Sequence, residues 1–267
     1  MSRVLRRLVD NLWLLGICRD VATWRALKSR GPRGADRGEL GHLRLRGLRG
    51  DLLFRPDATD LAVVWELFQG QEYAFEYGWP FRSILDCGAN IGVFLAWLLR
   101  ASSGHPVRYV AVEADPEAFR VLTRQAESMR AGDSCTLLQA AVWDRDGEVS
   151  FDDTGPSWGH HVGEGGQRRV KAMTLATILD QAGMQHCDLL KLDVEGGERS
   201  VLPSLVSCGE RIGAVVAELH DGLDYAWFAS VVESAGYRAF PPGRLFRSHP
   251  GALRIGSALE QQASARR

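Results

Sequence analysis

Two acidic residues, Asp86 and Glu113, stand at the ends of short apolar segments that give way to polar turns. Asp86 leads a turn that holds Gly88 and Gly92, and glycine lets a backbone approach a ligand closely. A carboxylate here repels a pyrophosphate and attracts a cationic amino group, so the turn differs from the G-x-G-x-x-G fingerprint of dinucleotide sites. An acid at the end of the next strand can accept both hydroxyls of a ribose. The pair predicts a ligand with a ribose and a positively charged end.

A second group of candidate residues belongs to two later apolar segments. Segment 186–192 is followed by Asp193, Glu195 and Glu198, and segment 211–219 leads into Glu218, His220 and Asp221. An alcohol needs a base or a cation beside it to act as a nucleophile at neutral pH. In one interpretation neutral His220 is the base, supported by Asp193. In another, Asp193, Glu195 and His220 hold a hard metal ion. In a structural alternative, Glu195 and Glu198 cap the following helix, which we favour for Glu198.

These two groups can meet only if neighbouring parallel strands carry them. The sequence predicts strands at about 83–87, 107–113, 135–142, 186–192 and 211–219. It predicts helices at about 90–102, 116–131, 174–184, 197–208 and 224–235. This alternation implies right-handed crossovers and a parallel sheet, with ligands outside the carboxyl ends of the strands. Shorter elements are also predicted: strands near 148–152 and 168–173, a hairpin within 42–56, and a following helix capped by Thr59 or Asp60.

Bulk composition limits the class of protein. The chain has 267 residues, of which 45% are hydrophobic, and this suits one large α/β domain with a small appendage. The formal net charge of -1 gives no overall attraction to nucleic acid or membranes. The five cysteines are scattered without a C-x-x-C pair, so they indicate buried thiols in a reducing compartment rather than disulfides or a zinc site. We therefore expect a cytoplasmic protein that does not bind nucleic acid.

The N-terminal segment 1–33 is basic, and its leucines Leu5, Leu8, Leu12 and Leu15 fall at helical spacing. Its longest apolar run is far shorter than the roughly 20 residues that a membrane span needs. The pattern fits a basic amphipathic helix in peripheral contact with a membrane, or a helix packed on the main domain, and we favour packing. A linker follows, so we expect two units, 1–39 and 40–267. The sequence does not indicate an oligomeric state.

Five motifs resemble those of FkbM-family methyltransferases, which depend on S-adenosylmethionine. They are ILDCGANIGVF, YVAVEADPEAF, LLQAAVWDRDGEVSF, LLKLDVEGGERSVL and VVAELHD, and the resemblance covers roughly residues 40–240. It implies a class I methyltransferase fold, Rossmann-like and α/β, with helices on both faces of a mostly parallel seven-stranded sheet of order 3-2-1-4-5-7-6. It also implies methyl transfer to a hydroxyl oxygen of a small-molecule or glycan acceptor, such as a sugar.

The resemblance assigns residues to the S-adenosylmethionine site. Glu113 would hold the ribose, and Ala141 and Val142 would border the adenine. The methionine end would be bordered by Asp86, Gly88, Ala89, Asn90 and Gly92. The strand-end residues themselves, rather than the resemblance, indicate Asp193 and His220 as catalytic, with a divalent metal as a second candidate cofactor.

The glycine-rich loop 153–167 is long enough to fold over an acceptor. Its His160 and His161 are further candidates for a base, and Trp158 and Tyr73 could form an apolar wall. Two rival functions are an NAD(P)-dependent oxidoreductase and a degenerate binding scaffold. The missing third glycine of the fingerprint disfavours the first. The intact strand-end residues disfavour the second, because fold alone does not require them.

Overall fold

The computed structural model describes residues 13–29, 39–56, 59–69, 81–102, 105–152, 161–162, 166, 168–240 and 255–260. The fold is given for these residues. Tyr73, Trp158 and His160 lie outside them, as does the side chain of His161.

The central sheet has a core of five parallel strands, which are β3 (Ser83–Cys87), β4 (Arg108–Glu113), β5 (Cys135–Gln139), β10 (Cys187–Leu192) and β11 (Ile212–Leu219). β12 (Arg238–Phe240) and β13 (Ile255–Glu260) extend it in parallel beside β11, which gives the order β12-β13-β11-β10-β3-β4-β5. The expected α/β class and mostly parallel sheet are confirmed. The order agrees with 3-2-1-4-5-7-6 once β12 and β13 are included.

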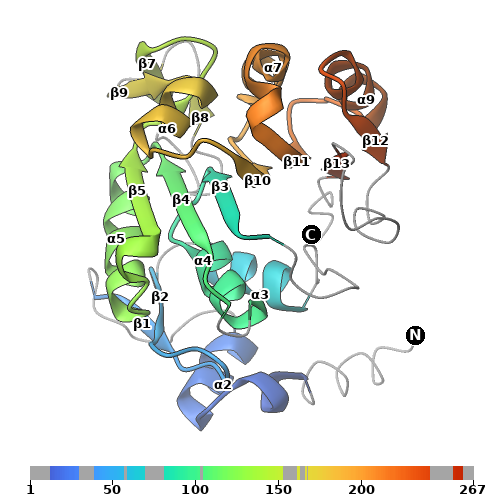
Figure 1. Cartoon of the computed structure of the whole chain (residues 1–267). Coiled ribbons are helices and arrows are strands. Elements are labelled where there is room, and N and C mark those ends of the chain that lie inside the picture. The colour runs from blue at the N-terminus through green and yellow to red at the C-terminus, as the bar shows by residue number, and fades with distance from the viewer. Residues whose placement is uncertain are drawn as a thin grey trace.

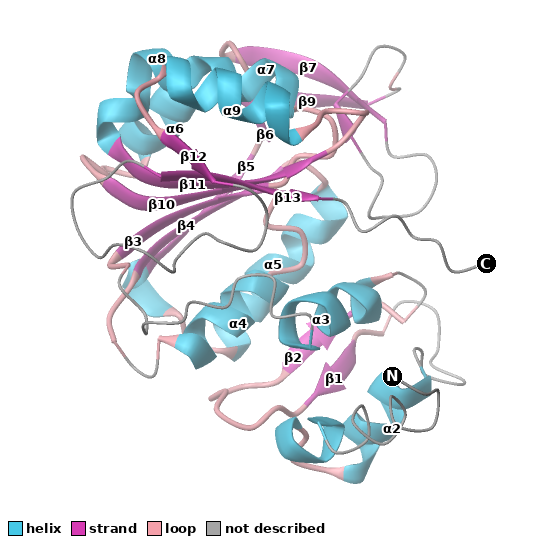
Figure 2. Cartoon of the chain, turned by 90° about the vertical axis from the view of Figure 1, so that its right-hand side faces the viewer, coloured by secondary structure: helices cyan, strands magenta, loops and turns pink. Residues whose placement is uncertain are grey.

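Helices cover both faces of this sheet (Figures 1 and 2). On one face lie α4 (Val93–Ala101) and α5 (Pro116–Ser128), and on the other lie α6 (Leu175–Gln181), α7 (Glu198–Val201), α8 (Leu205–Cys208) and α9 (Tyr225–Ser234). Because side chains alternate along a strand, Ile84 packs into one hydrophobic cluster and Leu85 into the other. The single helix expected over 197–208 is instead two short helices around a 3-10 turn that contains Pro203, which cannot continue an α-helix.

The single strand expected over 135–142 was wrong, because this segment forms two strands that belong to different sheets. β5 ends at Gln139, and β6 (Ala141–Val142) pairs with β9 (Arg168–Met173) in a second sheet. That sheet has the order β6-β9-β7-β8, with β7 (Gly147–Asp152) and β8 (His161–Val162). β5 is the edge strand of the central sheet, so the residues after Gln139 are free to take a new partner. The continuous apolar run hides this change of partner.

An N-terminal layer packs below α4 and α5 (Figure 2). It contains α2 (Val21–Ser29), the antiparallel hairpin of β1 (Gly41–Leu43) and β2 (Leu52–Phe54), and α3 (Asp60–Gln69). The Trp65 indole donates to the Leu27 carbonyl at 2.9 Å, and the Arg46 amide donates to the Ile17 carbonyl at 2.7 Å. The described part of the N-terminal segment is therefore packed, although Cys18 leaves the helical path to form a bridge with Leu45. Membrane contact of residues 1–33 stays a prediction.

Gln125 ties the hairpin to the main domain. Its side chain is fully buried on α5. Its Oε1 accepts the Leu53 amide at 2.7 Å, and its Nε2 donates to the Asp51 carbonyl at 3.2 Å. One amide side chain thus satisfies a donor and an acceptor of the hairpin backbone.

We predict that Gln125→Leu lowers the free energy of unfolding by about 2 kcal/mol, because it removes the partner of the buried Leu53 amide. The Asp51 carbonyl keeps its hydrogen bond from the Ser128 hydroxyl at 3.0 Å. Urea unfolding followed by circular dichroism measures this. Gln181→Leu makes the same change at an exposed helix position and should be close to neutral. Equal stabilities of the two variants would contradict this role of Gln125.

Candidate active site

Gly88 lies where two strand-end loops meet. Its φ is 80°, in the left-handed region that favours glycine. Its amide donates to the Val112 carbonyl at 2.9 Å, near the end of β4. A Cβ atom on it would stand 1.6 Å from the carbonyl oxygen of Asp193, just beyond β10. A side chain therefore cannot fit here without moving one of the two loops.

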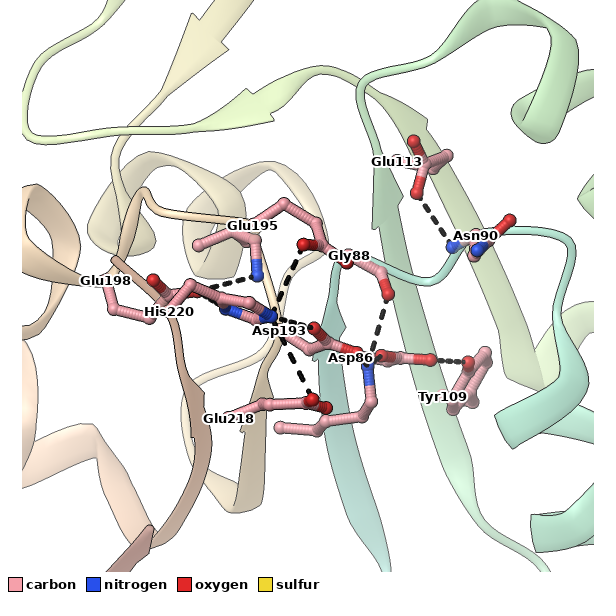
Figure 3. A network of polar contacts seen from close by, with 12 residues as sticks. Asp86, Gly88, Asn90, Tyr109, Glu113, Asp193, Glu195, Glu198, Glu218 and His220 are labelled. Carbon is pink, nitrogen blue, oxygen red and sulfur yellow. Dashed lines mark hydrogen bonds and ion pairs between the residues drawn. The ribbon is translucent and has the colours of Figure 1, made fainter. Parts of the chain in front are cut away.

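Asp86 lies beneath this turn, which changes its expected role. Its carboxylate is fully buried, accepts a hydrogen bond from the Tyr109 hydroxyl and pairs with Lys191 Nζ at 3.0 Å (Figure 3). Lys191 Nζ also donates to the Gly88 carbonyl at 3.1 Å and lies 3.4 Å from an Asp193 oxygen. Asp86 was expected to border the ligand; it is not among the residues that line the crevice described below, and Lys191 links it to the Gly88 carbonyl. The sequence analysis did not identify Lys191. The feature that could have indicated it is a single charged residue inside an otherwise apolar strand.

Glu113 joins the first two strand-end turns. Its two carboxylate oxygens accept the amides of Asn90 and Asp115, both at 2.7 Å (Figure 3). Burial raises the pKa of Glu113 to about 7, although the two amide hydrogen bonds oppose the shift. Each oxygen keeps further acceptor capacity, so the side chain can still accept from a ligand.

A crevice runs along the carboxyl ends of β4, β3 and β10. Among the predicted residues, its lining includes Gly88, Asn90, Glu113, Ala141, Val142 and Asp193. The lining does not include Ala89 and Gly92, whose part is to shape the turn. Gly92 has a φ of 86° and precedes the first residue of α4. The structure therefore brings six of the predicted residues to one crevice.

His220 stands at one corner of this crevice, beyond the end of β11. Its ring is almost fully buried, and its Nδ1 lies 2.9 Å from Glu198 Oε1. Its Nε2 faces Glu195 at 3.3 Å, and Asp193 and Glu218 at 3.9 Å each (Figure 3). Burial lowers the pKa of His220, but Glu198 and the other carboxylates outweigh it and raise the pKa to about 9. The neutral imidazole that we expected is therefore not the main form at neutral pH.

Glu198 has a larger role than the helix cap that we expected. Its side chain is fully buried, and its oxygens accept the amides of Val194 and Gly196, both at 3.1 Å. With its contact to His220, it fixes the loop after β10 and the ring orientation together. The sequence shows only an acid near a helix start, which is common without any such role.

Arg55 connects the N-terminal layer to the turn after β3, which carries Asn90. It follows β2, pairs with buried Asp60 at 2.8 Å, and donates to Asn90 Oδ1 at 3.3 Å. Asp60 was a candidate helix cap, but its carboxylate holds Arg55. The hairpin therefore helps to orient the turn after β3.

In the described part of the chain, no helix is long and apolar enough to cross a membrane. A peripheral contact and the cytoplasmic location stay predictions.

Comparisons with known proteins identify the family of this chain. The Methyltransferase FkbM domain model matches residues 86–239, which is more than half of the chain. Hexuronic acid methyltransferase AglP of Haloferax volcanii is 24% identical over 141 residues, which cover 52% of this chain and 56% of AglP. The chain thus matches little more than half the length of this curated relative.

Two solved structures are also similar. Methyltransferase FkbM from Methylobacillus flagellatus KT has 19% identity and a TM-score of 0.38, over 58% of this chain and 43% of that one. A SAM-dependent methyltransferase from Agrobacterium tumefaciens has 14% identity and a TM-score of 0.42, over 76% of this chain and 60% of that one. The extent of the family match decides the identity: the chain belongs to the Methyltransferase FkbM domain family.

Proposed function

We propose that this protein transfers the methyl group of S-adenosylmethionine to a hydroxyl oxygen of a sugar, a glycan or another small metabolite. The observation that carries this proposal is the single crevice lined by both Glu113 and Asp193. Glu113 is suited to the ribose of the methyl donor, and Asp193 leads to the polar corner around His220. One crevice can therefore hold the donor at one end and the acceptor at the other.

The donor end follows the chemistry of its lining. Ribose hydroxyls can donate to the Glu113 carboxylate, and the small apolar surface of Ala141 and Val142 suits an adenine. The backbone of Gly88 and Asn90 is left for the methionine end, above the buried Asp86–Lys191 pair. Family membership argues against the alternative of an NAD(P)-dependent oxidoreductase.

The acceptor end supplies alignment and charge. In the reaction the acceptor oxygen forms a bond to the methyl carbon while the carbon–sulfur bond breaks and its electron pair goes to sulfur. The acceptor hydroxyl also loses its proton, which a base or a cation at this corner would favour. We propose Asp193 and His220 as the residues that act on the hydroxyl. The similarity to AglP, a hexuronic acid methyltransferase, supports a sugar as the first acceptor to test.

The experiment for the proposed function uses purified protein, S-adenosylmethionine with a labelled methyl group, and a panel of hexuronic acids, neutral sugars and other alcohols. Mass spectrometry should find the mass of one labelled methyl group on an acceptor oxygen. Donor binding without transfer to any acceptor in the panel would favour the degenerate binding scaffold and contradict the proposal.

We predict that Glu113→Gln weakens S-adenosylmethionine binding about 10- to 100-fold, because hydrogen bonds to a charged acceptor are worth roughly 1.5–3 kcal/mol. In the parent protein, protonation of the raised Glu113 carboxyl below about pH 7 should weaken binding. Affinity should therefore rise with pH through about 7 and then level off. Isothermal titration calorimetry across this pH range measures both effects.

The matched control is Glu117→Gln, an exposed position at the start of α5. It should keep the parent's affinity and pH dependence. A folded Glu113→Gln protein with the parent's affinity would remove the ribose assignment.

We predict that His220→Asn lowers kcat by about 100-fold or more with little change in donor affinity. The physical reason is that His220 stands at the acceptor corner and is not part of the crevice lining. Steady-state kinetics and calorimetry separate the two effects. His186→Asn, at an exposed position, is the control and should keep the parent's kcat. Unchanged turnover in the His220 variant would show that the chemistry does not depend on this ring.

A further inference from the structure

Three side chains of different chemistry converge at the acceptor corner. Asp193 and Glu195 follow β10, and His220 follows the adjacent parallel strand β11. One ligand atom from each lies within 4.8 Å of the others. Atoms at such separations can share one bound cation.

The imidazole is already oriented for such a role. His220 is 5% exposed, and its Nδ1 side is held by the fully buried Glu198. Its Nε2 points into the space between Asp193 and Glu195, whose nearest carboxylate oxygens lie 3.9 Å and 3.3 Å away (Figure 3). In metal-binding histidines, one ring nitrogen usually binds the metal while the other donates its proton to a carboxylate. His220 has this arrangement, with Nδ1 on Glu198 and Nε2 facing the cluster.

The charge balance points the same way. Asp193, Glu195, Glu198 and Glu218 surround this one ring, and three of them approach its Nε2. Lys191 approaches Asp193 at 3.4 Å but lies closer to buried Asp86, at 3.0 Å. Four carboxylates therefore lie around one imidazole and one shared ammonium, and these two groups do not balance their negative charge. A divalent cation would compensate it.

We propose that Asp193, Glu195 and His220 form a binding site for a divalent cation of the Mn²⁺ or Mg²⁺ type at the acceptor corner. Two carboxylates favour a hard cation, and one imidazole favours Mn²⁺ over Mg²⁺. Asp193 and Glu195 line the crevice as well, so the cation would face the acceptor.

The catalytic role of this cation rests on the proposed function. A bound divalent cation acts as a Lewis acid toward the acceptor oxygen and eases the loss of the hydroxyl proton to solvent. The oxygen then takes the methyl group, and the sulfur of the donor keeps the electron pair. In this arrangement His220 is a ligand rather than the base. Cation binding releases the Nε2 proton to solvent, and the ring keeps its Nδ1 proton, which it donates to Glu198.

The first experiment measures binding without reference to activity. The full chain is treated with chelator, desalted and titrated with MnCl₂, and the free Mn²⁺ is followed by electron paramagnetic resonance. We expect a single saturable site, and Glu195→Gln should weaken it about 10-fold or more. The control Glu148→Gln removes an exposed acid of β7 and should bind as the parent does. No saturable binding to the parent, or equal binding to Glu195→Gln and the parent, would overturn the site.

Thermal melting keeps this test interpretable if a variant folds poorly. MnCl₂ should raise the melting temperature of the parent by mass action and should not raise that of Asp193→Asn. Equal shifts in both proteins would count against the site.

A second experiment separates this inference from the proposed function. Methyl transfer is measured with chelator and then with MnCl₂ restored, while calorimetry follows S-adenosylhomocysteine binding. We expect chelator to abolish transfer, Mn²⁺ to restore it, and S-adenosylhomocysteine binding to persist throughout. Full transfer in chelator would overturn the catalytic role of the cation and leave the proposed function standing. Saturable Mn²⁺ binding without transfer to any acceptor would support the site and count against the proposed function.

Discussion

The buried ion pair of Lys191 and Asp86 is the interaction on which the rest of the site depends. Both side chains are at most 5% exposed, and the pair joins adjacent strands β10 and β3. Removing one partner of such a pair costs roughly 3–5 kcal/mol, because the other charge stays buried alone. The same ammonium donates to the Gly88 carbonyl and approaches Asp193. One buried charge therefore sets the distance between the donor turn and the acceptor corner.

Burying the Glu113 carboxyl lowers stability when it is ionised, and a bound ligand can offset this cost. Glu113 is held in a buried place that raises its pKa from 4.5 to about 7. The folded state therefore binds a proton more tightly than the unfolded state, so this group's contribution is present below about pH 4.5 and is lost as pH rises through about 7. Two ribose hydroxyls would compensate the ionised carboxylate. Methyl-donor binding and stability should thus be coupled through this residue.

The sequence predicted those features that local pattern determines. The strands β3, β4, β10 and β11 are apolar runs ended by polar turns, and strand-end residues of parallel neighbours must meet at one edge. Residues whose role depends on tertiary packing were not predictable in the same way. Glu198 resembles an ordinary helix cap, and Lys191 resembles an isolated charge, until the packing places them beside His220 and Asp86. The split of the segment 135–142 was also hidden, because both of its halves are apolar and only the pairing partner changes.

The N-terminal layer extends the site beyond the part of the chain that matches the family. Residues before Asp86 lie outside that match, yet Arg55 holds the side chain of Asn90 at the donor turn. Arg55 in turn pairs with buried Asp60 at the start of α3. The donor turn is thus formed by family motifs, but a side chain of a layer that those motifs do not determine helps to hold it. Differences in this layer would change how firmly Asn90 is held while the strand-end residues of the crevice stay the same.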